Sequence, residues 1–203
     1  MIGKWNRSVI LTYIGLTASI IGMLLCMTDA NNIKISFVLL MVAGVCDLFD
    51  GSIARKCKRT EEEKAFGIEI DSIVDVMSFI AFPIVLLSAL GLNQWYNYII
   101  FAIFAICGVA RLGYFNIATA NPSKAIKHYI GLPVTYVAMI YPLLYLLKLC
   151  LAEDVMHWIL TISSLIISIL FVLKVKIIKP KGVAYLIFAL LAIIMIIVYC
   201  VFM

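Results

Sequence analysis

Long apolar windows alternate with short polar segments along the whole chain. Each window is longer than the roughly 18 apolar residues that mark a membrane-spanning helix. The pattern predicts seven such helices, at about 9–27, 33–53, 69–90, 95–115, 129–151, 155–174 and 182–202. The segments between them are too short for a separate soluble domain. We therefore expect residues 1–203 to form one domain, an all-α polytopic membrane bundle whose helices satisfy their own backbone hydrogen bonds.

The composition supports this interpretation. Hydrophobic residues make up 65% of the chain and charged residues only 13%, and the mean hydropathy is +1.13. A soluble domain of 203 residues could not bury so much apolar surface. The chain is therefore expected to be an integral membrane protein.

The basic residues are distributed unequally between the two sides of the predicted bundle. Of the 16 lysines and arginines, all but Lys34 and Lys148 lie before the first window, or near or beyond the ends of the second, fourth and sixth. By the positive-inside rule, the N-terminus and those loops face the cytoplasm, and the C-terminus lies outside. This predicts residence in the cytoplasmic membrane, with basic loops that contact anionic membrane lipids. Nucleic acid is not an expected partner, because no soluble basic face exists.

Four aspartates interrupt this apolar pattern. Asp47 and Asp50 end the second window, whereas Asp71 and Asp75 begin the third. A carboxylate inside a bilayer costs about 3 kcal/mol on insertion scales, so such residues usually face a cavity or a cation. On helices, spacings of three and four residues place each pair on one face. Carboxylate oxygens suit Mg²⁺ or Mn²⁺, so the pattern predicts a site for divalent ions at the membrane edge.

Small and cationic residues accompany the acids. Gly51, Ala54 and Gly67 leave little side chain beside the carboxylates, and Arg55 adds a positive charge. Acids, small residues and an arginine together favour a diphosphate held by two divalent ions, Mg²⁺ or Mn²⁺. A carboxylate-lined pathway for ions or protons, as in a transporter, is the alternative on physical grounds.

The order of these residues resembles a known signature. Asp47-x2-Asp50-Gly51-x2-Ala54-Arg55, followed by Gly67-x3-Asp71-x3-Asp75, is similar to the motif of the CDP-alcohol phosphotransferase family. Eleven residues separate Arg55 from Gly67 here, whereas eight or nine are usual in that family. The resemblance implies a homodimeric membrane enzyme with a polar cavity open to the cytoplasm. In that cavity a CDP-linked lipid would bind with two divalent metals, and an alcohol would attack it and release CMP.

The resemblance also implies roles for individual residues. Asp47, Asp50 and Asp71 would ligate metal, and Asp75 would both ligate metal and accept the proton of the attacking hydroxyl. The CDP-lipid would contact a larger set of residues, namely Gly51, Ala54, Arg55, Thr60, Gly67 and Thr12. Thr12 is what this chain keeps of a Pro-Asn-x-x-Thr segment found in many members. The alternative for Thr12 is an ordinary threonine that hydrogen-bonds to its own helix.

Three further stretches resemble the membrane-bound phosphatidylserine synthase branch of the family. They are Glu69–Pro83, Arg111-Leu-Gly-Tyr-Phe115-Asn116 and Gly131-Leu132-Pro133. This resemblance implies L-serine as the acceptor alcohol, with Arg111 on its carboxylate and with Asn116 and Ser78 as further contacts. Positive-inside anchoring is the alternative for Arg111, and a hydrogen bond to its own helix is the alternative for Ser78. Glycerol-phosphate and inositol-phosphate are the alternative acceptors within the family. Residues 155–203 carry no further motif.

Overall fold

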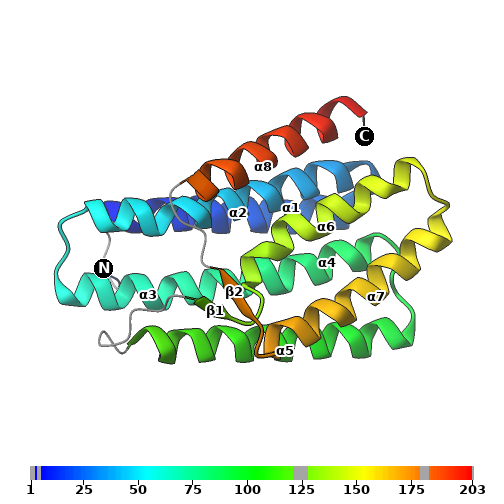
Figure 1. Cartoon of the computed structure of the whole chain (residues 1–203). Coiled ribbons are helices and arrows are strands. Elements are labelled where there is room, and N and C mark those ends of the chain that lie inside the picture. Colours follow the sequence, from blue (N-terminus) through cyan, green and yellow to red (C-terminus); the bar gives the residue numbers. More distant parts are fainter. Residues whose placement is uncertain (1–2, 4–5, 121–127, 179–182, 203) are drawn as a thin grey trace.

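The computed structural model describes residue 3 and residues 6–120, 128–178 and 183–202. The chain forms a bundle of roughly parallel and antiparallel helices (Figure 1). These are α1 (Ile10–Thr28), α2 (Ile33–Lys56), α3 (Glu61–Asp75), α4 (Phe82–Ala89), α5 (Trp95–Ala120), α6 (Val137–Tyr145), α7 (Glu153–Val172) and α8 (Val183–Phe202). A π-helical stretch, Val76–Ala81, joins α3 to α4 without a break.

The expected all-α membrane bundle is confirmed. Five helical stretches are long and apolar enough to cross a membrane, namely Arg7–Thr28, Ile33–Lys56, Glu61–Ala89, Trp95–Ala118 and Glu153–Val172. Two shorter apolar helices, Val134–Leu149 and Ile187–Val201, correspond to the fifth and seventh windows. Large apolar side chains on the outer faces are exposed, for example those of Leu24, Ile106 and Ile166. Such faces are suited to contact with lipid rather than water.

The start of the fifth window differs from the prediction. Residues 128–130 form a strand, β1 (His128–Ile130), that pairs antiparallel with β2 (Lys176–Ile178) after α7. Gly131 has φ +79°, which favours glycine, and Pro133 lacks a backbone N–H. A helix cannot run through these two positions. The backbone amides of Gly131 and Leu132 instead donate to the carbonyls of Val175 and Leu170, both at 2.9 Å.

Small residues let the helices approach closely in the core. A Cβ atom on Gly22 of α1 would lie 2.3 Å from the ring of Phe82 in α4, whose side chain is fully buried. A Cβ atom on Gly44 of α2 would lie 2.7 Å from the Cβ of Ala138 in α6. α1 packs along α2, and α5 packs along α7. These contacts fix α2 against α1 and α6, and thereby fix the direction in which its aspartates point.

The loop between α2 and α3 is short and ends in a defined cap. The Thr60 hydroxyl accepts a hydrogen bond from the Glu63 amide at 3.2 Å, while the Thr60 amide donates to the Glu63 carboxylate at 2.8 Å. This reciprocal capping box starts α3 only a few residues after α2 ends. The two helices therefore run antiparallel with their polar ends side by side (Figure 1).

The helix order predicts that the first turn of α1 and the last turn of α8 lie on opposite sides of the membrane. The first turn of α1 and the last turn of α8 lie at opposite ends in Figure 1. Reporter fusions at residue 61 and after residue 203 should therefore report cytoplasmic and external locations respectively, because basic residues concentrate around residue 61. If both reporters were found on one side, one of the helices would not cross the membrane.

Candidate active site

Four aspartates meet where α2 ends and α3 proceeds beside it. Asp47 and Asp50 come from α2, and Asp71 and Asp75 come from α3. One carboxylate oxygen from each of Asp47, Asp71 and Asp75 lies within 4.8 Å of the other two. Across the helix pair, Asp47 contacts Asp75 and Asp50 contacts Asp71. The helical spacing read from the sequence thus brings all four carboxyl groups into one cluster.

The cluster has the chemistry of a divalent-ion site. Like charges at this separation, inside an apolar bundle, repel each other strongly unless a cation lies between them. Every donor is a carboxylate oxygen, which is the ligand that Mg²⁺ and Mn²⁺ prefer. The residues therefore fit such ions, and Asp47, Asp71 and Asp75 form the tightest group. Asp50 is 7% exposed and accepts a hydrogen bond from the Thr12 hydroxyl at 3.0 Å.

A polar cavity of about 320 Å³ opens beside the carboxylates. All four aspartates line it, together with Gly51 and Arg55 from the last turns of α2. Arg55 is exposed, and its guanidinium donates to the Ser52 hydroxyl at 3.0 Å. The cavity therefore combines an acidic wall with a cation at one edge.

Arg111 of α5 also lines this cavity. Its side chain is only 5% exposed, and its guanidinium lies over the ring of Phe115, 5.2 Å from the ring centre. Gly131 packs beside it: a Cβ atom there would lie in ordinary contact with Arg111 Nε at 3.5 Å, whereas it would clash with the Phe171 carbonyl oxygen at 2.6 Å. The turn before α6 therefore helps to hold Arg111 in the cavity wall.

Several other residues expected at the site lie outside the cavity lining. Ser78 is 1% exposed and its hydroxyl hydrogen-bonds the Ser19 hydroxyl at 2.8 Å. The Asn116 amide donates to the Ser72 hydroxyl at 2.7 Å and so ties α5 to α3. Thr60 caps α3, and the Ala54 carbonyl accepts from the Cys57 amide at the end of α2.

The residues of the cavity lining that were not identified from the sequence include Thr135 and Tyr136. Thr135 and Tyr136, in the turn before α6, line the polar cavity, and the Thr135 side chain contacts the Asp47 carboxylate. They fall inside an apolar window that predicted an uninterrupted helix. The pair Gly131 and Pro133 was the available signal that the chain breaks just before them.

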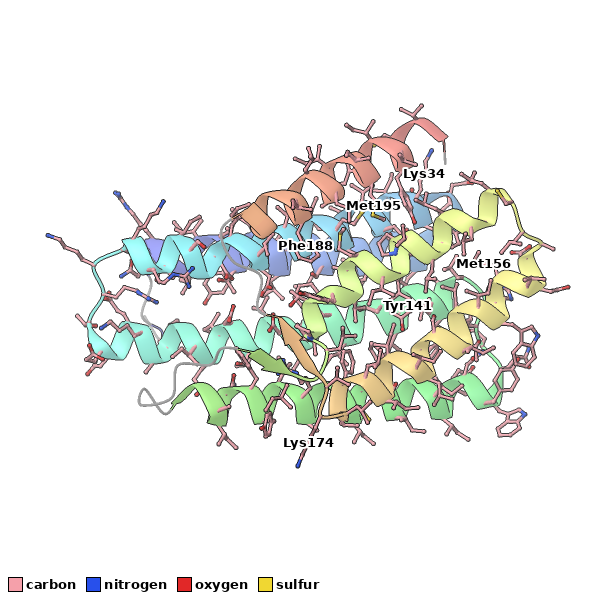
Figure 2. The ribbon with its side chains drawn as sticks, in the orientation of Figure 1. Lys34, Tyr141, Met156, Lys174, Phe188 and Met195 are labelled. Atoms are coloured by element: carbon pink, nitrogen blue, oxygen red, sulfur yellow. The ribbon has the colours of Figure 1, made fainter. Side chains whose placement is uncertain are left out.

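A second cavity adjoins the first. It has a volume of about 210 Å³ and lies between α2, α6 and α8. Its lining is almost entirely apolar, and Phe188 and Met195 reach it from α8 (Figure 2). Asp47, Leu48, Thr135 and Tyr136 line both cavities. A polar compartment and an apolar compartment therefore meet at Asp47.

Metal binding is testable without any assumption about the reaction. Asp71→Asn should weaken Mn²⁺ binding to the purified protein by at least about tenfold, because it removes one charged ligand. Asp29→Asn is the matched control, since Asp29 lies in the α1–α2 connection and hydrogen-bonds Asn31. Titration of Mn²⁺ followed by electron paramagnetic resonance would measure both. Equal affinities in the two variants would contradict a metal site at the aspartates.

Comparison with known proteins assigns this chain to a family. The family model for CDP-alcohol phosphatidyltransferase matches residues 5–170. A CDP-diacylglycerol–serine O-phosphatidyltransferase of Saccharomyces cerevisiae is 33% identical over 125 residues, which are 58% of this chain and 43% of the relative. The archaetidylserine synthase of Methanothermobacter thermautotrophicus is 29% identical over 117 residues, 57% of this chain and 48% of that protein.

A further relative, the CDP-diacylglycerol–serine O-phosphatidyltransferase of Methanocaldococcus jannaschii, is 36% identical over 99 residues, 49% of this chain and 44% of the relative. The matches thus span somewhat less than half the length of each of these relatives. The family model nevertheless covers α1 to α6 and nearly all of α7, including every aspartate of the cluster. The chain therefore belongs to the CDP-alcohol phosphatidyltransferase family.

Proposed function

We propose that this chain is a CDP-lipid:L-serine phosphatidyltransferase, with residues 1–203 as one catalytic membrane domain. The observation that carries the proposal is the polar cavity, which four carboxylates and Arg111 line together, with an apolar compartment beside it. Such a cavity can receive a lipid diphosphate and a small polar acceptor together. The serine relatives in three organisms support the choice of acceptor.

The four aspartates are the proposed metal ligands. Asp47, Asp50, Asp71 and Asp75 would hold two divalent ions, Mg²⁺ or Mn²⁺. Ions bound there would neutralise the diphosphate and the charge that develops on the departing CMP. The close approach of three carboxylates supports this assignment, since a bound cation stabilises ionised carboxylates that lie this close together.

The CDP-linked lipid would occupy both cavities. Its diphosphate would lie against Gly51 and Arg55, where a Cβ atom on Gly51 would meet nothing closer than the Arg55 guanidinium at 3.7 Å. One hydrocarbon tail would enter the apolar compartment, whether the lipid is built on diacylglycerol or on archaeol. Thr12 would act through its hydrogen bond to Asp50.

Serine would bind between Arg111 and the aspartates. The Arg111 guanidinium suits the serine carboxylate, because a planar fork of donors matches a carboxylate in two parallel hydrogen bonds. Its burial in the cavity wall favours this role over membrane anchoring, for which a side chain would reach the head groups. Asn116 and Ser78 would contribute by holding α5 and α1 against the acidic helix through Ser72 and Ser19.

The reaction is a displacement at the lipid-side phosphorus. The serine hydroxyl oxygen attacks that phosphorus, Asp75 accepts the hydroxyl proton, and the bond from phosphorus to the CMP oxygen breaks. The new phosphodiester joins serine to the lipid, and CMP leaves with the electron pair. Asp75 suits the role of proton acceptor because it lines the cavity that both substrates would enter.

Acceptors that carry a phosphate are less well matched to the cavity. Of the described residues that line it, Arg55 and Arg111 are the cations. If Arg55 serves the diphosphate, one arginine remains for the acceptor, which suits a single carboxylate better than a dianionic phosphate. This charge count favours serine over glycerol-phosphate and inositol-phosphate.

The family and the charge pattern support a proposal for the setting of the site. We propose that the site faces the cytoplasm, in the cytoplasmic membrane, and that two copies form a homodimer. The basic residues around the α2–α3 loop support that orientation. The mass of the detergent-solubilised protein, measured by light scattering, would test the homodimer.

An acceptor-competition assay tests the reaction. Purified protein given CDP-diacylglycerol, Mg²⁺ or Mn²⁺ and equal serine, glycerol-phosphate and inositol-phosphate should release CMP and form phosphatidylserine predominantly. CMP release with another acceptor would keep the family reaction and reject serine. A protein that moves ions but releases no CMP would be a transporter instead.

Arg111→Lys tests the carboxylate clamp. The serine KM should rise by about tenfold or more while the CDP-lipid KM changes little, because lysine cannot reproduce the two parallel hydrogen bonds. Arg7→Lys, at an exposed arginine before α1, is the control. Steady-state kinetics with each substrate varied in turn would measure both. An unchanged serine KM in Arg111→Lys would return this residue to an anchoring role.

A further inference from the structure

Two glycines of the aspartate motif lie inside helices without a packing reason. Gly51 is in α2 and Gly67 is in α3, and neither has a positive φ. A glycine inside a helix is less stable than alanine by about 0.5–1 kcal/mol. A Cβ atom would nevertheless fit at both positions, with its nearest neighbours at 3.7 Å and 3.6 Å. The absence of a side chain at Gly51 and Gly67 therefore serves something other than helix packing.

Each of these glycines is covered by an arginine. The atom nearest to a Cβ on Gly51 is Arg55 Nη1, and the atom nearest to a Cβ on Gly67 is Arg59 Nη1. Arg55 belongs to the family signature, whereas Arg59 comes from the loop between α2 and α3. That loop belongs to the segment that is longer here than the family pattern. Arg59 therefore lies beside Gly67 in the same way that Arg55 lies beside Gly51, with Nη1 nearest to the Cβ position of the glycine.

One nitrogen of the Arg59 guanidinium is buried without a partner among the residues that the structure describes. The side chain is half-buried, and its Nε is fully buried without a hydrogen bond to any residue that the structure describes. Neighbouring cations differ, since Arg55 donates to Ser52 and Lys64 pairs with Glu61 at 2.6 Å. A buried charged donor without a partner costs free energy, so its position favours an anionic ligand.

A second polar atom of this kind lies in the segment that meets Arg59 at Gly67. Val9 Cγ1 is 3.9 Å from the Cβ position of Gly67, on the same bare face as Arg59. Its chain neighbour Ser8 is 3% exposed, and the Ser8 hydroxyl is also buried without a hydrogen bond to the described residues. Two buried polar atoms near this contact, Ser8 Oγ and Arg59 Nε, thus lack hydrogen bonds to the described residues.

We propose that Arg59 is a second arginine for the nucleotide substrate and binds its diphosphate beside Gly67. The inference rests on the proposed function, whose cavity lies one helical turn further along α3, at Asp71. Both phosphates of a diphosphate diester are negatively charged, so charge-assisted hydrogen bonds from Arg55 on the Gly51 side and from Arg59 on the Gly67 side would both favour its binding.

Binding of CDP to the full-length purified chain, measured by calorimetry with Mg²⁺ in a neutral detergent, tests this directly. Arg59→Gln should weaken CDP binding by about tenfold or more, because a charge-assisted hydrogen bond is lost. Arg59→Lys keeps the charge and should fall between Arg59→Gln and the wild type. Lys58→Gln is the matched control from the same loop, since Lys58 is exposed, and its affinity should stay within about twofold of the wild type.

The possible outcomes separate this inference from the proposed function. A wild type that binds CDP, beside an Arg59→Gln protein that binds it equally well, would overturn the inference and leave the function standing. That result would fit a head-group contact for Arg59 instead. A wild type that does not bind CDP at all would overturn both. Thermal unfolding of each variant verifies the fold, and Arg59→Lys decides by the same criterion if Arg59→Gln unfolds.

Discussion

The structure depends on holding four like charges together inside an apolar bundle. Asp47, Asp71 and Asp75 approach within 4.8 Å through one oxygen each, and their repulsion grows as water is excluded. Two antiparallel helices joined by a short capped loop impose this proximity, and the close packing of α1 and α6 on α2 maintains it. The rest of the bundle provides the rigidity that keeps the carboxylates from separating.

The helical part of this arrangement is readable from the sequence. The spacings Asp47 to Asp50 and Asp71 to Asp75 place each pair on one helical face, because an α-helix has 3.6 residues per turn. Length and polarity fix the membrane-spanning windows, since a helix that crosses a bilayer needs about 20 apolar residues. Local rules therefore suffice for the number of helices and for the acidic wall.

Contacts that depend on distant pairing are not readable in this way. Thr135 reaches Asp47 because β1 interrupts an apolar window by pairing with β2, whose residues lie 46 to 50 positions later in the chain. Ser78 lies in the π-helical stretch, where the wider turn shifts the face that follows Asp75. Thr60 could be assigned to phosphate or to a capping box from its spacing to Glu63, and the free protein uses it as a cap.

Helix α8 lines the apolar cavity although it lies outside the part of the chain that matches the family. The family match ends at residue 170, before α8 begins, yet α8 supplies Phe188 and Met195 to the apolar cavity. In the proposed reaction, α8 would therefore supply part of the wall that meets hydrocarbon, whereas the carboxylates lie on α2 and α3. On this proposal, substitutions in α8 would change which tail length or branching fits, and the carboxylates on α2 and α3 would stay in place. Adaptation to a different membrane lipid would then begin in α8 rather than in the aspartate motif.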